Sequence, residues 1–199
     1  MPNWCMNQFT VKHEDKEMLD KFCDAVNNGN LFQTFIPMPD ELLDTEAPKL
    51  IEENQSSEQL IAKYGYDNWY SWRLANWGTK WDIGEGAIVE RLDDNSARGS
   101  FDTPWNPPIY AFEALTEMGF DLDVLFDEEG MGLIGVFNMY GEQTYDYDFE
   151  DPDWKDKIDN DDVVALLDER YDMWVQAQED QQYYFDSLED EQEEEQSDG

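Results

Sequence analysis

Hydrophobic and polar residues follow two different periods at the start of the chain. Residues 3–12 (NWCMNQFTVK) are rich in strand-forming side chains with partial alternation, which makes Trp4 and Phe9 available to a sheet. Residues 14–26 place apolar side chains at the three- and four-residue spacing of an amphipathic helix, and the run NNGN at 27–30 ends it. The chain therefore begins with a strand followed by a helix.

The next part of the chain is less regular. Pro37 and Pro39 interrupt residues 31–43 and prevent regular strand pairing, so we expect an extended crossing segment there. Residues 44–54 are polar and predict a surface loop. A serine at 56 or 57 is placed to cap a short helix that reaches Lys63.

The second half alternates strands with one helix. We expect strands at 87–92, 97–103, 122–126, 132–140 and 143–149, and a helix at 109–118 that Pro107 and Pro108 initiate. The economical arrangement is α+β, a ferredoxin-like antiparallel sheet with helices packed on one face. A stripe of apolar residues predicts a further acidic helix from Asp161 to about Asp186, followed by a disordered acidic tail. The expected domains are 1–149 (ferredoxin-like), 150–187 (acidic linker and C-terminal helix) and 188–199 (tail).

The stretch 64–81 (YGYDNWYSWRLANWGTKW) holds four of the eight tryptophans. Asp67 or Asn68 is placed to cap a helix that Gly78 ends, and residues 79–83 then read as the start of a strand. Arg73 is four residues from both Trp69 and Trp77, so a helix would place its guanidinium between two indoles. Two interpretations remain: a packed corner of the core, or a pocket lined by Trp69, Trp72, Arg73, Asn76, Thr79 and Lys80.

Charge limits the possible partners. The chain has 49 acidic and 12 basic residues, a net charge of −37, which disfavours direct binding to nucleic acid or to an anionic membrane. No apolar run is long enough to span a membrane, and no signal peptide is evident. We therefore expect a cytoplasmic protein. Two cysteines, Cys5 and Cys23, are too few for a disulfide framework and are expected to be reduced and buried.

Catalytic chemistry has few candidates. His13 is the only histidine and is expected to have a surface or capping role, and no phosphate-binding glycine loop occurs. The acidic clusters lack the order of ligands that an EF-hand needs, and Glu128 and Glu129, beside a glycine turn, are expected to be solvated. We therefore assign no catalytic residue, no metal site and no cofactor.

The acidic segment 146–162 (DYDFEDPDWKDKIDNDD) interleaves carboxylates with aromatic residues. One interpretation is a solubilising surface or an adaptation to high salt. The other is a surface that imitates the closely spaced phosphates of a DNA duplex and occupies a DNA-binding cleft, with aromatic anchors. The candidate partner-binding residues are Asp146, Asp148, Glu150, Asp151, Asp153, Trp154, Asp156, Asp159, Asp161 and Asp162.

Five blocks, MPNWCMN, FIPMPDEL, YGYDNWYSWRLANWGTKWD, FDTPWNPPIYAFEAL and FDEEGMGLIGVF, resemble the YubB-like proteins of bacteriophages and plasmids. The resemblance runs from Met1 to about Phe137. It implies a ferredoxin-like domain and an accessory protein of a mobile element, and it supplies no catalytic residues, since that family has no assigned activity.

Together these patterns favour a non-enzymatic acidic accessory protein that binds a basic, DNA-binding host protein, as a DNA mimic or defence inhibitor. The alternative is a small-ligand or nucleotide-derivative binding protein, or an enzyme, that uses the Trp-rich stretch.

Overall fold

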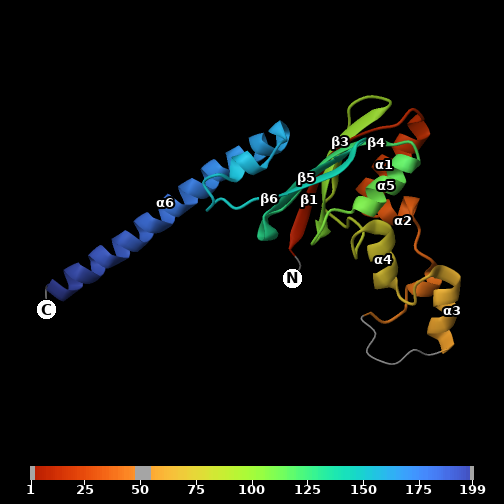
Figure 1. The fold of residues 1–199 in the computed structure, drawn as a ribbon, viewed down its shortest axis with the longest axis horizontal. Helices are drawn as coiled ribbons and strands as arrows, with labels where there is room; N and C mark the ends of the chain where they lie inside the picture. The colour runs from red at the N-terminus through yellow and green to blue at the C-terminus, as the bar shows by residue number, and fades with distance from the viewer. Residues whose placement is uncertain (1–2, 48–54, 198–199) are drawn as a thin grey trace. The chain divides into compact units, whose positions relative to one another are not determined.

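The chain forms two units in the computed structural model, which describes residues 3–47 and 55–197 (Figure 1). Met1–Asp146 form the first unit and Tyr147–Gly199 the second. The polar loop expected at 44–54 lies mostly outside the described residues. The domain ranges 1–149, 150–187 and 188–199 stay predictions.

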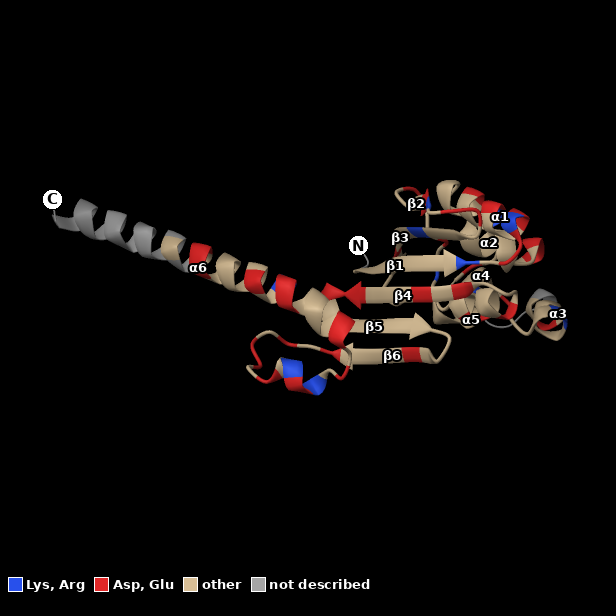
Figure 2. Cartoon of the chain, turned by 90° about the horizontal axis from the view of Figure 1, so that it is seen from above, with Lys and Arg blue, Asp and Glu red and all other residues tan. Residues whose placement is uncertain are grey.

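The first unit contains a six-stranded antiparallel sheet in the order β2-β3-β1-β4-β5-β6 (Figure 2). The first four strands in this order, β2, β3, β1 and β4, have the arrangement of the split βαβ fold, which confirms the predicted ferredoxin-like α+β class. The β5–β6 hairpin extends the sheet beyond β4. The strands are β1 (Trp4–Lys12), β2 (Ile88–Arg91), β3 (Ser96–Pro104), β4 (Asp121–Glu128), β5 (Leu133–Asn138) and β6 (Gly141–Asp146).

Two helices, α1 (Lys16–Asn27) and α5 (Ile109–Glu117), lie on the same side of this sheet (Figure 1). The sequence dictates that side, because alternate β1 residues Cys5, Asn7, Phe9 and Val11 are buried. Asp15 caps α1, since its carboxylate accepts from the backbone N–H of Glu17 at 2.8 Å. The remaining helices of the unit are α2 (Leu31–Phe35), α3 (Gln55–Tyr64) and α4 (Trp69–Trp77), with 3₁₀ helices η1 (Asp40–Leu42) and η2 (Glu129–Met131).

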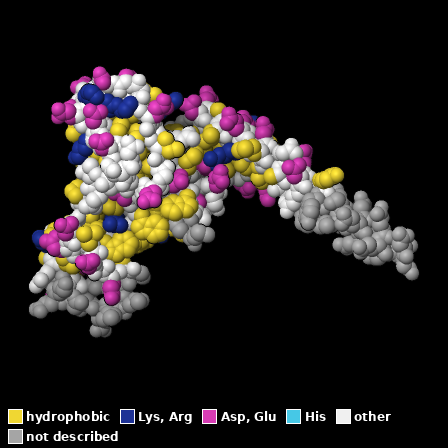
Figure 3. Space-filling model, turned by 180° about the vertical axis from the view of Figure 1, so that it is seen from behind, with side chains coloured by type: hydrophobic (Ala, Val, Ile, Leu, Met, Phe, Trp, Pro, Cys, Tyr) yellow, Lys and Arg dark blue, Asp and Glu magenta, His cyan; other side chains and the backbone are white. Residues whose placement is uncertain are grey.

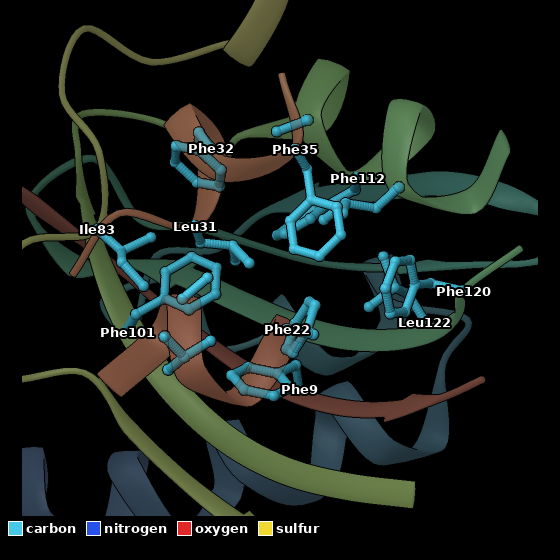
Figure 4. Packing of buried hydrophobic residues seen from close by; sticks show 14 of the residues in the cluster. Phe9, Phe22, Leu31, Phe32, Phe35, Ile83, Phe101, Phe112, Phe120 and Leu122 are labelled. Carbon is cyan, nitrogen blue, oxygen red and sulfur yellow. The ribbon is translucent and has the colours of Figure 1, made fainter. Parts of the chain in front are cut away.

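Phenylalanine is the most common residue in the core between the sheet and the helices (Figure 4). Phe22 of α1 contacts Phe9 of the central strand with ring centroids 5.6 Å apart, and it contacts Phe120 at 5.3 Å. Phe32 contacts Phe101 edge-on at 6.0 Å. Offset and edge-on aromatic pairs of this kind add to the free energy gained by burying the rings.

Two expectations from the sequence are wrong in the segments that Asp82 connects. Residues 79–83 do not form a strand, and 31–35 form helix α2 in place of an extended segment. The Asp82 carboxylate accepts from the backbone N–H groups of Phe32 at 2.9 Å and Gln33 at 2.8 Å, at the N-terminal end of α2. A helix start stabilised by a carboxylate 49 residues away leaves no local signal in the sequence.

The second unit contains η3 (Trp154–Lys157) and the helix α6 (Asp161–Ser197). Asn160 accepts from the N–H groups of Asp162 and Val163 and so caps α6. The helix was expected from Asp161 to about Asp186, and its bounds in the structure are Asp161–Ser197, a run that no glycine or proline interrupts. Residues 147–149, expected to end the last strand, lie outside β6.

Replacing Asp82 by alanine should lower the free energy of unfolding by about 2–4 kcal/mol, because buried backbone N–H groups lose their acceptor. Urea denaturation followed by circular dichroism measures this change. Glu85→Ala, at an exposed position three residues later, is the control and should change stability by less than about 0.5 kcal/mol. Equal stabilities for the two variants would contradict the capping role of Asp82.

Candidate functional site

Helix α4 carries the Trp-rich stretch, and its local geometry follows the predicted pattern. Asn68 caps it by accepting from the N–H of Ser71, and Gly78 ends it at a left-handed φ of 84°. The Arg73 guanidinium carbon lies 5.2 Å from the Trp69 ring centroid and 4.8 Å from that of Trp77, which confirms the predicted stack.

Burial lowers the pKa of Arg73, and the nearby Asp82 charge opposes that effect. Burial also raises the pKa of the Asp82 carboxyl, while its backbone hydrogen bonds and the Arg73 charge lower it. The two ions thus compensate each other beneath the indoles. This is the chemistry of a structural ion pair at longer range, not that of an acid–base catalyst.

Several of the six side chains proposed for the pocket are engaged within the fold. Trp72 and Thr79 are buried, and Thr79 donates to the carbonyl of Pro104 at 3.4 Å. Asn76 donates to the carbonyl of Trp72 within its own helix at 2.8 Å. Trp77, on the same helix, is also buried and donates its indole N–H to the carbonyl of Ile36 at 2.9 Å. The stretch is therefore mainly a packed corner of the core.

Three exposed indoles come from segments that are far apart in the sequence. Trp4 is 50% exposed, Trp81 41% and Trp105 42%. The Trp4 and Trp81 ring centroids lie 6.2 Å apart, and the Trp105 backbone N–H donates to the carbonyl of Asn3, next to Trp4. We call Trp4, Trp81 and Trp105 the indole patch. Sequence analysis missed it because only the fold brings these positions together.

Figure 3 shows hydrophobic side chains gathered around a basic side chain on the face of the molecule beside α4. The basic residue that contacts the indole patch is Lys80, whose Nζ lies 4.2 Å from the Trp81 ring centroid. Arg73 donates to the Lys80 carbonyl at 3.3 Å. Of the predicted pocket residues, Lys80 is thus the one placed for a surface contact.

His13 lines an open pocket of about 930 Å³, together with Lys12, Asn95 and Asp121. Its Nδ1 accepts from the backbone N–H of Asp15 at 3.0 Å, and its Nε2 lies 3.3 Å from the carbonyl of Met118. Asn95 donates to the carbonyls of His13 and Glu14 at 2.8 Å. Both ring nitrogens thus form hydrogen bonds with the backbone, while Asp15 and not His13 caps α1.

Neither thiol is activated. Burial raises the pKa of Cys5 to about 12 and also raises that of Cys23, and both are free and buried as predicted. Within residues 3–47 and 55–197, no group of three or more His, Cys, Asp and Glu side chains is arranged to hold a metal ion. In the same residues no helix is long and apolar enough to cross a bilayer.

The sequence predicted a solvated Glu128, and this prediction is wrong. Glu128 is buried, with 1% of its surface exposed. The pairing of Glu128 with Leu133 places it at the end of β4, inside the β4–β5 ladder, and not in the glycine turn. Its Oε2 has no hydrogen-bond partner among the described residues. Two acidic residues before a glycine turn are normally exposed, so local sequence gave no sign of this burial.

The acidic segment divides into exposed carboxylates and buried aromatics. Trp154, proposed from the sequence as a partner-binding residue, is 3% exposed, so it is not available to a partner in this structure. Asp151 is half-buried and forms an ion pair with Lys157. The other predicted partner-binding residues are exposed: Asp146 at the end of β6, and Asp148, Glu150, Asp153, Asp156, Asp159, Asp161 and Asp162 in the second unit.

An aromatic cluster organises the second unit. The Phe149 ring centroid lies 5.5 Å from that of Trp154 and 5.6 Å from that of Tyr171 on α6. Tyr171 and Trp174 stack at 5.9 Å. This cluster fixes the turn before α6 against the helix, so the carboxylates of residues 148–162 project from a folded scaffold.

Trp72→Ala should lower the free energy of unfolding by about 3–5 kcal/mol, because a buried indole is lost and a cavity remains. Tyr70→Ala, on an exposed side of the same helix, should cost less than about 1 kcal/mol. Chemical denaturation of both variants measures the difference. A folded Trp72→Ala variant with wild-type stability would contradict the assignment of this stretch to the core.

Comparison with known proteins supports the fold class. Residues 76–168, just under half of the chain, match the family described as the ferredoxin-like domain in Api92-like protein. The crystal structure of protein api92 from Yersinia pseudotuberculosis covers 74% of this chain and 99% of its own, with 11% identity and a TM-score of 0.42, which carries no functional information. No curated protein matches the chain significantly.

The matched region begins within α4 and ends within α6. It therefore includes the acidic segment, for which the sequence suggested no counterpart among known proteins. Over these residues the chain is similar to the ferredoxin-like domain in Api92-like protein.

Proposed function

We propose that the protein is a non-enzymatic binding protein whose second unit presents carboxylates to a basic surface of a partner protein. The observation that supports this is the aromatic cluster of Phe149, Trp154, Tyr171 and Trp174, which turns the apolar side chains of the acidic segment inward. A charged surface that only improves solubility does not need a folded scaffold. Preorganised carboxylates lose little conformational entropy on binding, which favours affinity.

The charge distribution supports the same proposal. Residues 140–199 carry 23 acidic and 3 basic residues, a net charge of −20, against −17 for residues 1–139. Figure 2 shows the acidic positions along the described part of α6. Two of the three basic residues of this region, Lys155 and Lys157, are paired within the unit with Asp168 and Asp151. The exposed surface that remains is strongly anionic and would steer a cationic partner towards it.

The finer proposal is that the partner is a DNA-binding protein of the host and that the second unit occupies its DNA site. A DNA duplex presents one charge per about 1.7 Å of axis, and proteins that bind it hold complementary rows of Lys and Arg. Together with the resemblance to mobile-element proteins, this makes the chain an inhibitor of host defence or nucleic-acid processing in the host cytoplasm.

Recovery of a DNA-binding protein from host lysate tests this proposal, with the wild-type chain as bait. Binding should weaken as salt rises, and duplex DNA should displace the partner. Recovery of only generic basic proteins, or failure of DNA to compete, would refute DNA mimicry.

Matched charge variants separate a defined surface from overall charge. The test variant converts four exposed carboxylates of the second unit to amides: Glu150→Gln, Asp153→Asn, Asp156→Asn and Asp161→Asn. The control converts four exposed carboxylates of the first unit: Glu17→Gln, Asp24→Asn, Glu85→Gln and Glu117→Gln. Partner affinity should fall at least about tenfold in the test variant alone. Equal losses would indicate a nonspecific charge effect.

The Asp151–Lys157 pair gives a prediction for pH. The hydrogen bond from Lys157 lowers the pKa of the Asp151 carboxyl. A carboxyl with a lowered pKa stabilises the fold above its unfolded pKa of about 3.9, and this contribution is lost as pH falls through the folded-state value. Lys157→Ala should therefore raise the pKa of Asp151, as measured by NMR titration.

Lys155→Ala is the control for that titration, because Lys155 pairs with Asp168 and not with Asp151. It should leave the Asp151 pKa unchanged. An unchanged pKa in Lys157→Ala would show that the ion pair does not persist in solution.

A further inference from the structure

The indole patch has three properties that a packed corner does not require. Trp4, Trp81 and Trp105 expose between 41% and 50% of their surface although buried positions lie close by. Large aromatic side chains gathered on a surface mark binding sites more often than they serve the fold. The three come from the start of β1, the segment after α4 and the segment after β3, so the fold itself assembles them.

The second property is backbone strain. Trp105 has a φ of 75° and is the one non-glycine residue with positive φ among those described. A bulky side chain in this left-handed region costs stability, and such costs cluster at functional sites. Glycine would adopt this conformation without strain, so the indole at position 105 is retained against a local preference.

The third property is an uncompensated positive charge. Acidic residues outnumber basic ones by 49 to 12, yet Lys80 forms no ion pair within the described part of the chain. Its Nζ lies over the Trp81 ring, at the edge of the patch.

We propose that the indole patch binds a free nucleotide, with the base stacked on the exposed indoles and the phosphate paired with Lys80. Stacking on aromatic side chains suits any planar base, and an ammonium group supplies the contact to the phosphate. A nucleic-acid strand is the less favoured occupant, because the net charge of −37 repels a polyanion far more than a single nucleotide. This site is separate from the carboxylate surface of the proposed function and does not depend on it.

Titration of the full chain with AMP, adenosine and ribose 5-phosphate tests the proposal, followed by NMR of the indole N–H signals and by calorimetry. AMP should bind more tightly than adenosine or ribose 5-phosphate, since only AMP offers both the ring and the anion. The signals of Trp81 and Trp105 should move, while that of Trp77, which is 1% exposed, should not. Absence of binding at millimolar AMP would overturn the proposal.

Three variants divide the contributions. Trp105→Gly removes an indole and relieves the strain, so it should weaken AMP binding by about tenfold without lowering the melting temperature. Trp81→Ala should weaken AMP and adenosine alike, whereas Lys80→Gln should weaken AMP and leave adenosine unchanged. Tyr140→Ala is the control, because Tyr140 is 88% exposed in the β5–β6 turn and lies in neither proposed site.

Wild-type AMP affinity in both Trp105→Gly and Trp81→Ala would overturn the assignment. Tighter binding of a short oligonucleotide than of AMP, with a steep dependence on salt, would also overturn it, since the surface would then serve a nucleic-acid strand.

Discussion

The pairing of β1 on both of its edges is the constraint on which the rest of the fold depends. It is antiparallel to β3 on one side and to β4 on the other, and its inward side chains are buried under the helices. The amide of Asn7 donates to the carbonyl of Cys5 at 2.9 Å and to Thr103 Oγ1 at 3.0 Å, which ties β1 to β3 within the core. A slip of one residue would move Phe9 and Val11 to the opposite face, so burial and hydrogen bonding fix the same register.

The Trp-rich corner depends on this sheet and shows how one stretch divides between structure and surface. Arg73 is held between Trp69 and Trp77, and the half-buried carboxylate of Asp82 lies close enough to compensate its charge. These groups are committed to packing, as their burial requires. Lys80 and Trp81 follow α4 in the sequence and lie where the corner reaches the surface.

The second unit also buries aromatic side chains, but most of its surface is made of exposed carboxylates. Its carboxylates are too numerous to be buried, so they stay in water, while Phe149, Trp154 and Tyr171 pack together. The aromatic residues that looked like anchors for a partner are consequently the support of the acidic surface. The contact proposed with a partner therefore changes from aromatic insertion to charge complementarity. Such a contact depends on salt, and it raises the association rate more than the affinity.

The sequence by itself determined the α+β class, most strands and helices, and the Arg73 stack, because these depend on patterns and contacts within a few residues. It could not place helix α2, the burial of Glu128 or the indole patch. Each of these depends on residues distant in the chain: Asp82 caps α2 from 49 residues away, and the Trp4 ring meets the Trp81 ring only in the folded chain. Periodicity records which side of an element is apolar, whereas only the tertiary structure decides which elements meet and which polar groups they enclose.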